Sequence, residues 1–110
     1  MKRELIYSSE YLEFAQSVTP RTQEKLLYAT AILETVCPIP TKFVKKLTST
    51  DFYEMRVSTD NAIRVILFSA DNENINLATR IIFLNGFTKK STKDYTKEID
   101  KAIRILRRAL

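Results

Sequence analysis

The chain has 110 residues, of which 45% are hydrophobic and 28% are charged, and it contains no histidine and one cysteine. This size and composition predict one globular domain over residues 1–110, and no apolar run approaches the roughly 20 residues of a membrane-spanning helix. The missing histidine excludes imidazole-based catalysis and nearly every zinc site, and the lone Cys37 excludes an intrachain disulfide, as is typical of a cytoplasmic protein.

The chain begins with a predicted strand and a predicted helix. Residues 2–8 fit a short strand. Over residues 10–18, apolar side chains recur at spacings of three and four, which predicts an amphipathic helix that Ser8 or Ser9 caps.

A second helix is predicted directly after the first. Thr19 and Pro20 suit its N-cap and first turn, and its apolar stripe continues to about Val36. So short a connection predicts an antiparallel helical hairpin. Residues 41–51 are predicted to be a connecting segment, and Cys37 is predicted to be a small buried or half-buried side chain.

Two strands, over residues 52–57 and 63–69, alternate between the two faces of a predicted sheet. A three-residue loop, with Asn61 near the left-handed conformation, keeps their apolar faces together. In that register Arg56 and Arg64 share one face, whereas a two-residue turn would separate them.

A polar turn over residues 70–74 precedes a third strand over residues 77–87, whose apolar run suits a central position. Gly86, the only glycine, indicates close backbone approach or a bend. Strict alternation places Arg80 on the opposite face from Asn85, so Arg80 is interpreted as structural.

The last element is a basic helix from about Tyr95, with Asp94 as its predicted N-cap. Its predicted buried stripe consists of Ile99, Ala102, Ile103, Leu106 and Leu110. The whole formal charge of +5 lies in residues 87–110, because the earlier residues contain ten basic and ten acidic side chains. The predicted fold is α+β: an N-terminal helical hairpin packed on a small antiparallel sheet, with a C-terminal basic helix.

Two groups of residues have the chemistry of a phosphate site. The segment 85–93 places lysines and hydroxyls after a strand end, where they either bind phosphates or form an ordinary polar loop. Arg56 and Arg64 interrupt apolar strands, and they either form a clamp for phosphate or an ion pair with Glu54. Tyr95 beside these cations is a candidate to stack on an unpaired base.

Four segments in order resemble the RelE/ParE toxin superfamily, and within it the HigB-like, phage-derived branch. They are Phe52-Tyr53-Glu54-Met55-Arg56-Val57, Arg64-Val65-Ile66-Leu67-Phe68, Ile82-Phe83-Leu84-Asn85-Gly86-Phe87-Thr88-Lys89-Lys90 and Lys97-Glu98-Ile99-Asp100-Lys101-Ala102. The resemblance implies a RelE-like fold, a toxin neutralised by a helix-turn-helix type antitoxin, and cleavage of mRNA on the ribosome. Many relatives have histidine at the position of Asn85 and Thr-Pro at that of Asp94-Tyr95.

The resulting hypothesis is a metal-independent, cofactor-independent endoribonuclease that uses 2′-hydroxyl attack and acts in the cytoplasm on ribosome-bound mRNA. The predicted catalytic residues are Arg56, Arg64, Lys89 and Lys90; the predicted RNA-binding residues are Asn85, Lys93, Tyr95 and Lys97. The general base is either a lysine crowded by cations or Glu54. The alternatives are a ParE-like toxin that poisons gyrase and a non-catalytic basic domain that binds nucleic acid or a partner protein.

Overall fold

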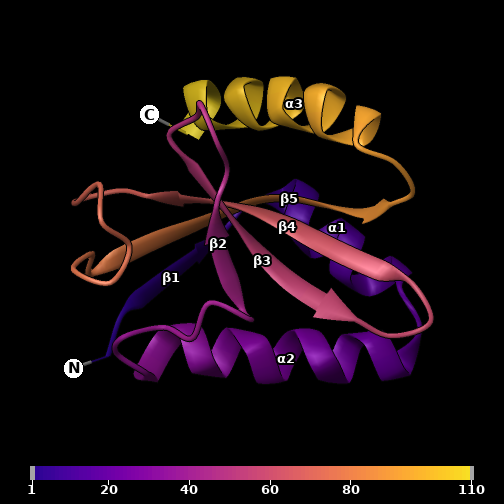
Figure 1. Cartoon of the computed structure of the whole chain (residues 1–110), viewed down its shortest axis with the longest axis horizontal. Coiled ribbons are helices and arrows are strands. Elements are labelled where there is room, and N and C mark those ends of the chain that lie inside the picture. Colours follow the sequence, from indigo (N-terminus) through magenta and orange to yellow (C-terminus); the bar gives the residue numbers. More distant parts are fainter. Residues whose placement is uncertain (1, 110) are drawn as a thin grey trace.

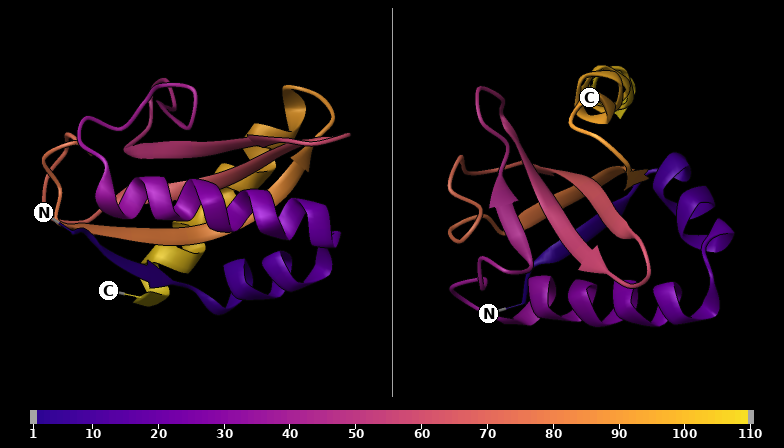
Figure 2. Two further views of the ribbon diagram at one scale, coloured as in Figure 1. Left: turned by 90° about the horizontal axis from the view of Figure 1, so that it is seen from below. Right: turned by 45° about the vertical axis from the view of Figure 1, so that its right-hand side comes forward.

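The computed structural model describes residues 2–109 as a central sheet covered by helices on both faces (Figure 1). Helix α3 covers one face, and helices α1 and α2 cover the other, as the turned views also show (Figure 2). The elements, in chain order, are β1 (Glu4–Tyr7), α1 (Ser9–Ser17), α2 (Pro20–Thr35), β2 (Val44–Lys46), β3 (Phe52–Ser58), β4 (Ala62–Ser69), β5 (Arg80–Lys89) and α3 (Lys93–Ala109). The predicted α+β fold, with two N-terminal helices on a sheet and a C-terminal basic helix, is confirmed.

The sheet has the strand order β1-β5-β4-β3-β2. Strands β2 to β5 are antiparallel to their neighbours, whereas β1 pairs parallel with β5. The expectation of a purely antiparallel sheet was therefore wrong at one edge. No short turn joins β1 to β5, so the hairpin constraint that enforces antiparallel pairing is absent there.

Each face of the sheet has its own apolar core. Helices α1 and α2 contribute Tyr11, Leu26 and Leu33 to the core that contains Met55 and Val65. Helix α3 contributes Ala102 and Ile105 to a second core, with Phe52, Ile66, Leu84 and Phe87. The predicted stripe of α3 omitted Ile105, which is 3% exposed, while Leu110 lies outside the described residues.

The two N-terminal helices begin where the sequence predicts. The Ser8 hydroxyl accepts a hydrogen bond from the Tyr11 amide at 2.9 Å. The Thr19 hydroxyl accepts from the Thr22 amide at 3.3 Å, with Pro20 in the first turn of α2. Both caps satisfy amides that have no partner within the helix, so local chemistry alone sets these starts.

The β3–β4 hairpin has the predicted register. Arg56 lies opposite Arg64 and Ser58 lies opposite Ala62, which leaves residues 59–61 as the loop. Asn61 is not left-handed, because Ser49 is the one non-glycine residue with positive φ among residues 2–109. The loop is closed instead by the Thr59 amide, which donates to the Asn61 carbonyl at 3.0 Å.

Three boundaries differ from expectation. The segment over residues 41–51 contains the short edge strand β2, which pairs with β3. Strand β5 begins at Arg80 instead of residue 77, because the Asp71 carboxylate accepts from the Thr79 and Arg80 amides and closes a longer loop. Helix α3 begins at Lys93, and Asp94 is not its N-cap. The Asp94 carboxylate accepts from the amides of Lys90 and Ser91 at 2.7 and 3.0 Å, which lowers its pKa.

A bulge in β5 changes which residues face α3. The register shifts opposite Ile66 and Leu67, so Leu84 and Asn85 both lie on the α3 side. Arg80 and Asn85 therefore share a face, contrary to the expectation from strict alternation. Arg80 is nevertheless structural, because its Nε lies 3.3 Å from Glu4 at the exposed edge of the sheet.

Cys37 is exposed, contrary to the expectation of a buried or half-buried side chain. It follows the end of α2, where the chain leaves the helical layer. None of the helices within residues 2–109 is long and apolar enough to cross a membrane.

The close backbone approach expected at Gly86 is confirmed. A Cβ atom there would lie 2.2 Å from Cδ2 of Phe14, well inside contact distance. We expect Gly86→Ala to lower the free energy of unfolding by about 1–3 kcal/mol, measured by urea denaturation, because the ring must move. In a protein that already carries Phe14→Ala, Gly86→Ala should lower the free energy of unfolding much less, because the ring that it contacts is absent. An equal cost in both backgrounds would contradict this contact as the cause.

The burial of the Tyr11 phenol leads us to expect that the protein loses stability at alkaline pH. Its side chain is 5% exposed, and burial raises the pKa of Tyr11 to about 12. Above the usual tyrosine pKa of about 10, the unfolded chain releases a proton that the folded chain retains, so the stability falls as the pH rises through 12. We expect Tyr11→Phe to flatten this decline, measured as the free energy of unfolding between pH 8 and pH 12. An unchanged slope would show that Tyr11 does not cause it.

Candidate functional site

Glu54 lies between two arginines on the face of the sheet covered by α3. One of its carboxylate oxygens lies 3.6 Å from Nε of Arg56, and the other lies 3.9 Å from Nε of Arg64. The alternation of β3 and β4 places the three side chains on one face, as the sequence predicts. The ion-pair and clamp interpretations are therefore compatible, because the pair that Glu54 forms also holds the two guanidinium groups together.

The two arginines differ in their access to solvent. The side chain of Arg56 is 37% exposed, whereas that of Arg64 is 7% exposed. Arg64 donates from Nη1 to the Ile63 carbonyl at 3.0 Å, and its Nε has no hydrogen-bond partner within residues 2–109. A phosphate that enters the site would therefore meet Arg56 first and Arg64 below it.

Tyr95 connects the first turns of α3 to this cluster. Its hydroxyl donates to Glu54 Oε2 at 2.6 Å, and its ring packs edge-on against Phe87 with centroids 5.5 Å apart. Burial, followed by the hydrogen bond to Glu54, raises the pKa of the Tyr95 phenol. Lys89 Nζ lies 5.4 Å from the centre of the Tyr95 ring, so a base that stacks on this face must displace the amine. We name Glu54, Arg56, Arg64, Lys89 and Tyr95 the Glu54 cluster.

The other lysines expected in the site lie on the exposed surface around the cluster. Lys90 follows β5, and Lys93 and Lys97 lie in the first turns of α3. None of their ammonium groups forms a salt bridge within the described part of the chain. These three residues add positive charge beside the cluster without joining its contacts.

Asn85 does not have the exposure that RNA binding requires. Its side chain is 1% exposed, and its amide donates to the Glu98 carbonyl at 3.2 Å and to Glu98 Oε1 at 3.0 Å. These bonds tie β5 to α3, the helix that carries Tyr95. We expected Asn85 to contact RNA directly. It is instead buried, and its contact with Glu98 positions α3 on the sheet.

Sequence reasoning assigned no role to Glu98 and did not predict the contact between Phe87 and Tyr95. Glu98 holds Asn85, and Phe87 supports the ring of Tyr95. The polar Asn85 at the end of an apolar strand was the one signal for such a partner, because a buried amide requires one. Within residues 2–109, no three histidine, cysteine or carboxylate side chains gather in a group that could hold a metal ion.

Comparison with known proteins identifies the family of the chain and its fold. Residues 13–107 match the family described as "Phage derived protein Gp49-like (DUF891)". A solved structure of the E. coli toxin RelE, a double arginine-to-alanine mutant in the free state, superimposes with a TM-score of 0.65 at 13% identity, over 92% of this chain and 98% of that chain. No curated protein matches the chain. The chain therefore belongs to the phage-derived Gp49-like family and has the fold of the RelE toxin superfamily.

Proposed function

We propose that the protein is the toxin of a type II toxin-antitoxin pair, and that it cleaves mRNA on the ribosome. The observation that carries this proposal is the Glu54 cluster, where two guanidinium groups and a phenol contact one carboxylate, and the Lys89 ammonium group lies beside the ring of that phenol. Guanidinium and ammonium groups stabilise charge that develops on a phosphate, and a carboxylate is able to accept a proton. The family and the fold support the same function.

The proposed reaction needs only the RNA and the side chains of the protein. The 2′-hydroxyl attacks the adjacent phosphorus, the bond to the 5′-oxygen breaks, and the products are a 2′,3′-cyclic phosphate and a free 5′-hydroxyl. Arg56 and Arg64 would bind the non-bridging oxygens, while Lys89 and the exposed Lys90, Lys93 and Lys97 hold neighbouring phosphates.

Glu54 is the base that the geometry favours. A phosphate bound by Arg56 and Arg64 competes with the carboxylate for the guanidinium groups, and the released carboxylate accepts the proton of the 2′-hydroxyl. The Tyr95 phenol, whose pKa is raised by burial and by Glu54, stays protonated at neutral pH and is able to supply a proton to the leaving 5′-oxygen. The ribosome would contribute the alignment of the RNA strand.

The expected partner is an antitoxin of the helix-turn-helix type. An acidic segment of such a protein would neutralise the excess of +5 and cover the Glu54 cluster. Ribosomes and mRNA place the activity in the cytoplasm, and the proposed reaction uses no cofactor.

The test is to induce the chain without its antitoxin and to map mRNA 5′ ends by primer extension. We expect new ends inside codons that carry 5′-hydroxyl groups, together with arrested translation. An induced chain that stops growth through DNA damage without new mRNA ends would contradict the proposal and support a ParE-like action on gyrase. Binding of RNA without cleavage by ribosome-engaged protein would instead support a non-catalytic domain.

A further inference from the structure

A groove of about 550 Å³ lies between α2 and β3, and Arg56 is the one residue of its lining that takes part in the proposed cleavage reaction. Tyr28 from α2 and Phe43 from the segment before β2 supply aromatic surface, and Arg21, Lys25 and Arg56 supply positive charge. Its size falls within the range of about 300–1,000 Å³ that small-molecule sites occupy.

Of the two aromatic side chains of the groove, Tyr28 is open to solvent and Phe43 is half-buried. Tyr28 is 63% exposed, and its ring lies 6.0 Å from that of Phe43, centre to centre. Lys42 Nζ lies 5.2 Å from the centre of the Phe43 ring. An exposed ring beside cations offers a stacking surface to an unpaired base and charge to its phosphate.

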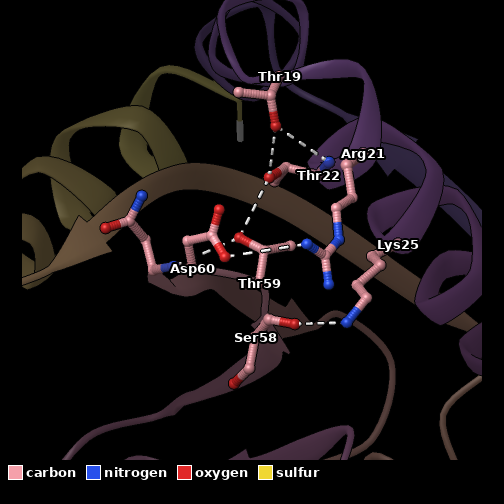
Figure 3. A network of polar contacts seen from close by, with 8 residues as sticks. Thr19, Arg21, Thr22, Lys25, Ser58, Thr59 and Asp60 are labelled. Atoms are coloured by element: carbon pink, nitrogen blue, oxygen red, sulfur yellow. Dashed lines mark hydrogen bonds and ion pairs between the residues drawn. The ribbon is translucent and has the colours of Figure 1, made fainter.

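The groove is cationic, and contacts within the protein hold its walls in place. Three basic residues line it against a single acidic residue, Glu24. Lys25 Nζ donates to the Ser58 carbonyl at 2.7 Å, and Arg21 Nη1 lies 3.8 Å from Asp60 Oδ1. Figure 3 shows these contacts between the start of α2 and the β3–β4 hairpin.

A chain of hydroxyl groups completes this connection. The Thr19 hydroxyl donates to that of Thr22 at 3.0 Å, and the Thr22 hydroxyl donates to that of Thr59 at 3.3 Å (Figure 3). Thr22 is 4% exposed, Thr59 is half-buried and Thr19 is exposed, so these bonds run from the surface to a buried hydroxyl. The groove is therefore largely formed before any ligand binds, which lowers the ordering cost of binding.

Arg56 makes the groove continuous with the Glu54 cluster. Arg56 is one of the residues that line the groove, and its Nε lies 3.6 Å from Glu54 Oε1 on the α3 side of the sheet. A strand held at the cluster can therefore extend past Arg56 toward Tyr28. We propose that the groove binds unpaired nucleotides of the RNA strand next to the scissile phosphate, with a base stacked on Tyr28; this inference rests on the proposed function.

The chemistry favours unpaired RNA over other occupants. In a duplex the bases are stacked on one another, so Tyr28 would have no base face to contact. An acidic antitoxin segment would use the cations but would have no need of an open aromatic surface. Unpaired RNA uses both features of the groove.

The experiment measures the affinity of the whole chain for a fluorescein-labelled ten-nucleotide oligouridylate by fluorescence anisotropy. A 2′-O-methyl group at every position prevents cleavage by 2′-hydroxyl attack. The variant is Tyr28→Ala, and its control is Leu27→Ala, a neighbouring residue of α2 that is 72% exposed and lies outside the groove. A duplex of the same length serves as the second probe.

We expect Tyr28→Ala to weaken binding of the single strand by about five- to tenfold, the low end of the usual effect of removing one base–aromatic stack. Leu27→Ala should bind like the wild type, and Tyr28→Ala should bind the duplex like the wild type. We also expect Arg21→Met to reduce the slope of log affinity against log salt by about one.

Two outcomes would overturn the groove as an RNA site. One is equal affinity of Tyr28→Ala and wild type for the single strand, and the other is no binding of that strand by the wild type. If the chain cleaves mRNA but its RNA binding does not depend on Tyr28, the groove is excluded as an RNA site and the proposed function stands. If its RNA binding depends on Tyr28 but it cleaves no mRNA, the proposed function is excluded and the groove stands as an RNA site.

Discussion

Arg64→Ala is expected to abolish growth inhibition and to lower the rate of mRNA cleavage by about 10²–10³-fold, the usual cost of removing one donor that stabilises a transition state. Arg64 lies below the exposed Arg56, and its Nε is not used in hydrogen bonds among residues 2–109. This leaves donor capacity for a phosphate. The measurements are colony formation after induction and the rate at which new mRNA 5′ ends accumulate.

Loss of Arg64 also removes a partner of the buried Glu54, so folding must be measured separately. Loss of one partner of a buried ion pair costs about 3–5 kcal/mol, although the contact of Glu54 with Arg56 reduces this effect. Arg64→Lys retains the charge and loses the planar fork, and we expect it to be folded and strongly impaired. Arg80→Ala, at an exposed ion pair on the sheet edge, is the control and should remain toxic. A folded Arg64→Ala variant with full toxicity would exclude Arg64 from the mechanism.

Arg3→Met is expected to lower the free energy of unfolding by about 3 kcal/mol. Arg3 is 2% exposed and donates from Nη1 to the carbonyls of Leu33 and Val36, both at 2.8 Å. A further bond joins Nη2 to the Asn76 carbonyl at 3.3 Å. The carbonyls at the end of a helix have no partner within it, so Arg3 satisfies the end of α2 and places a cation at its negative pole.

Methionine has a comparable length but leaves these buried carbonyls unpaired. Thermal and urea unfolding measure the loss, and a chain of this size should melt about 10–20 °C lower. Lys2→Met is the control, because Lys2 is 73% exposed and lies 3.8 Å from Glu34, so its change should stay within about 0.5 kcal/mol. Equal melting temperatures of Arg3→Met and Lys2→Met would contradict this prediction. They would show that water satisfies the carbonyls at the end of α2 as well as the guanidinium group does.

Local patterns in the sequence determined most of the secondary structure and part of the candidate site. Ser8 and Thr19 start the two helices, because a cap depends only on residues a few positions away. The alternation of β3 and β4 placed Arg56 opposite Arg64, because a three-residue loop is the connection that keeps both apolar faces together.

The tertiary structure alone decided the features that depend on distant residues. The bulge in β5 brings Asn85 to the α3 face, where it bonds to Glu98, and no repeat in the sequence marks it. Arg3 reaches the end of α2, and Tyr95 reaches Glu54, across separations of 30 to 41 positions. Side-chain periodicity specifies which face a residue occupies within one element, but the partner of a buried polar group depends on how the elements pack.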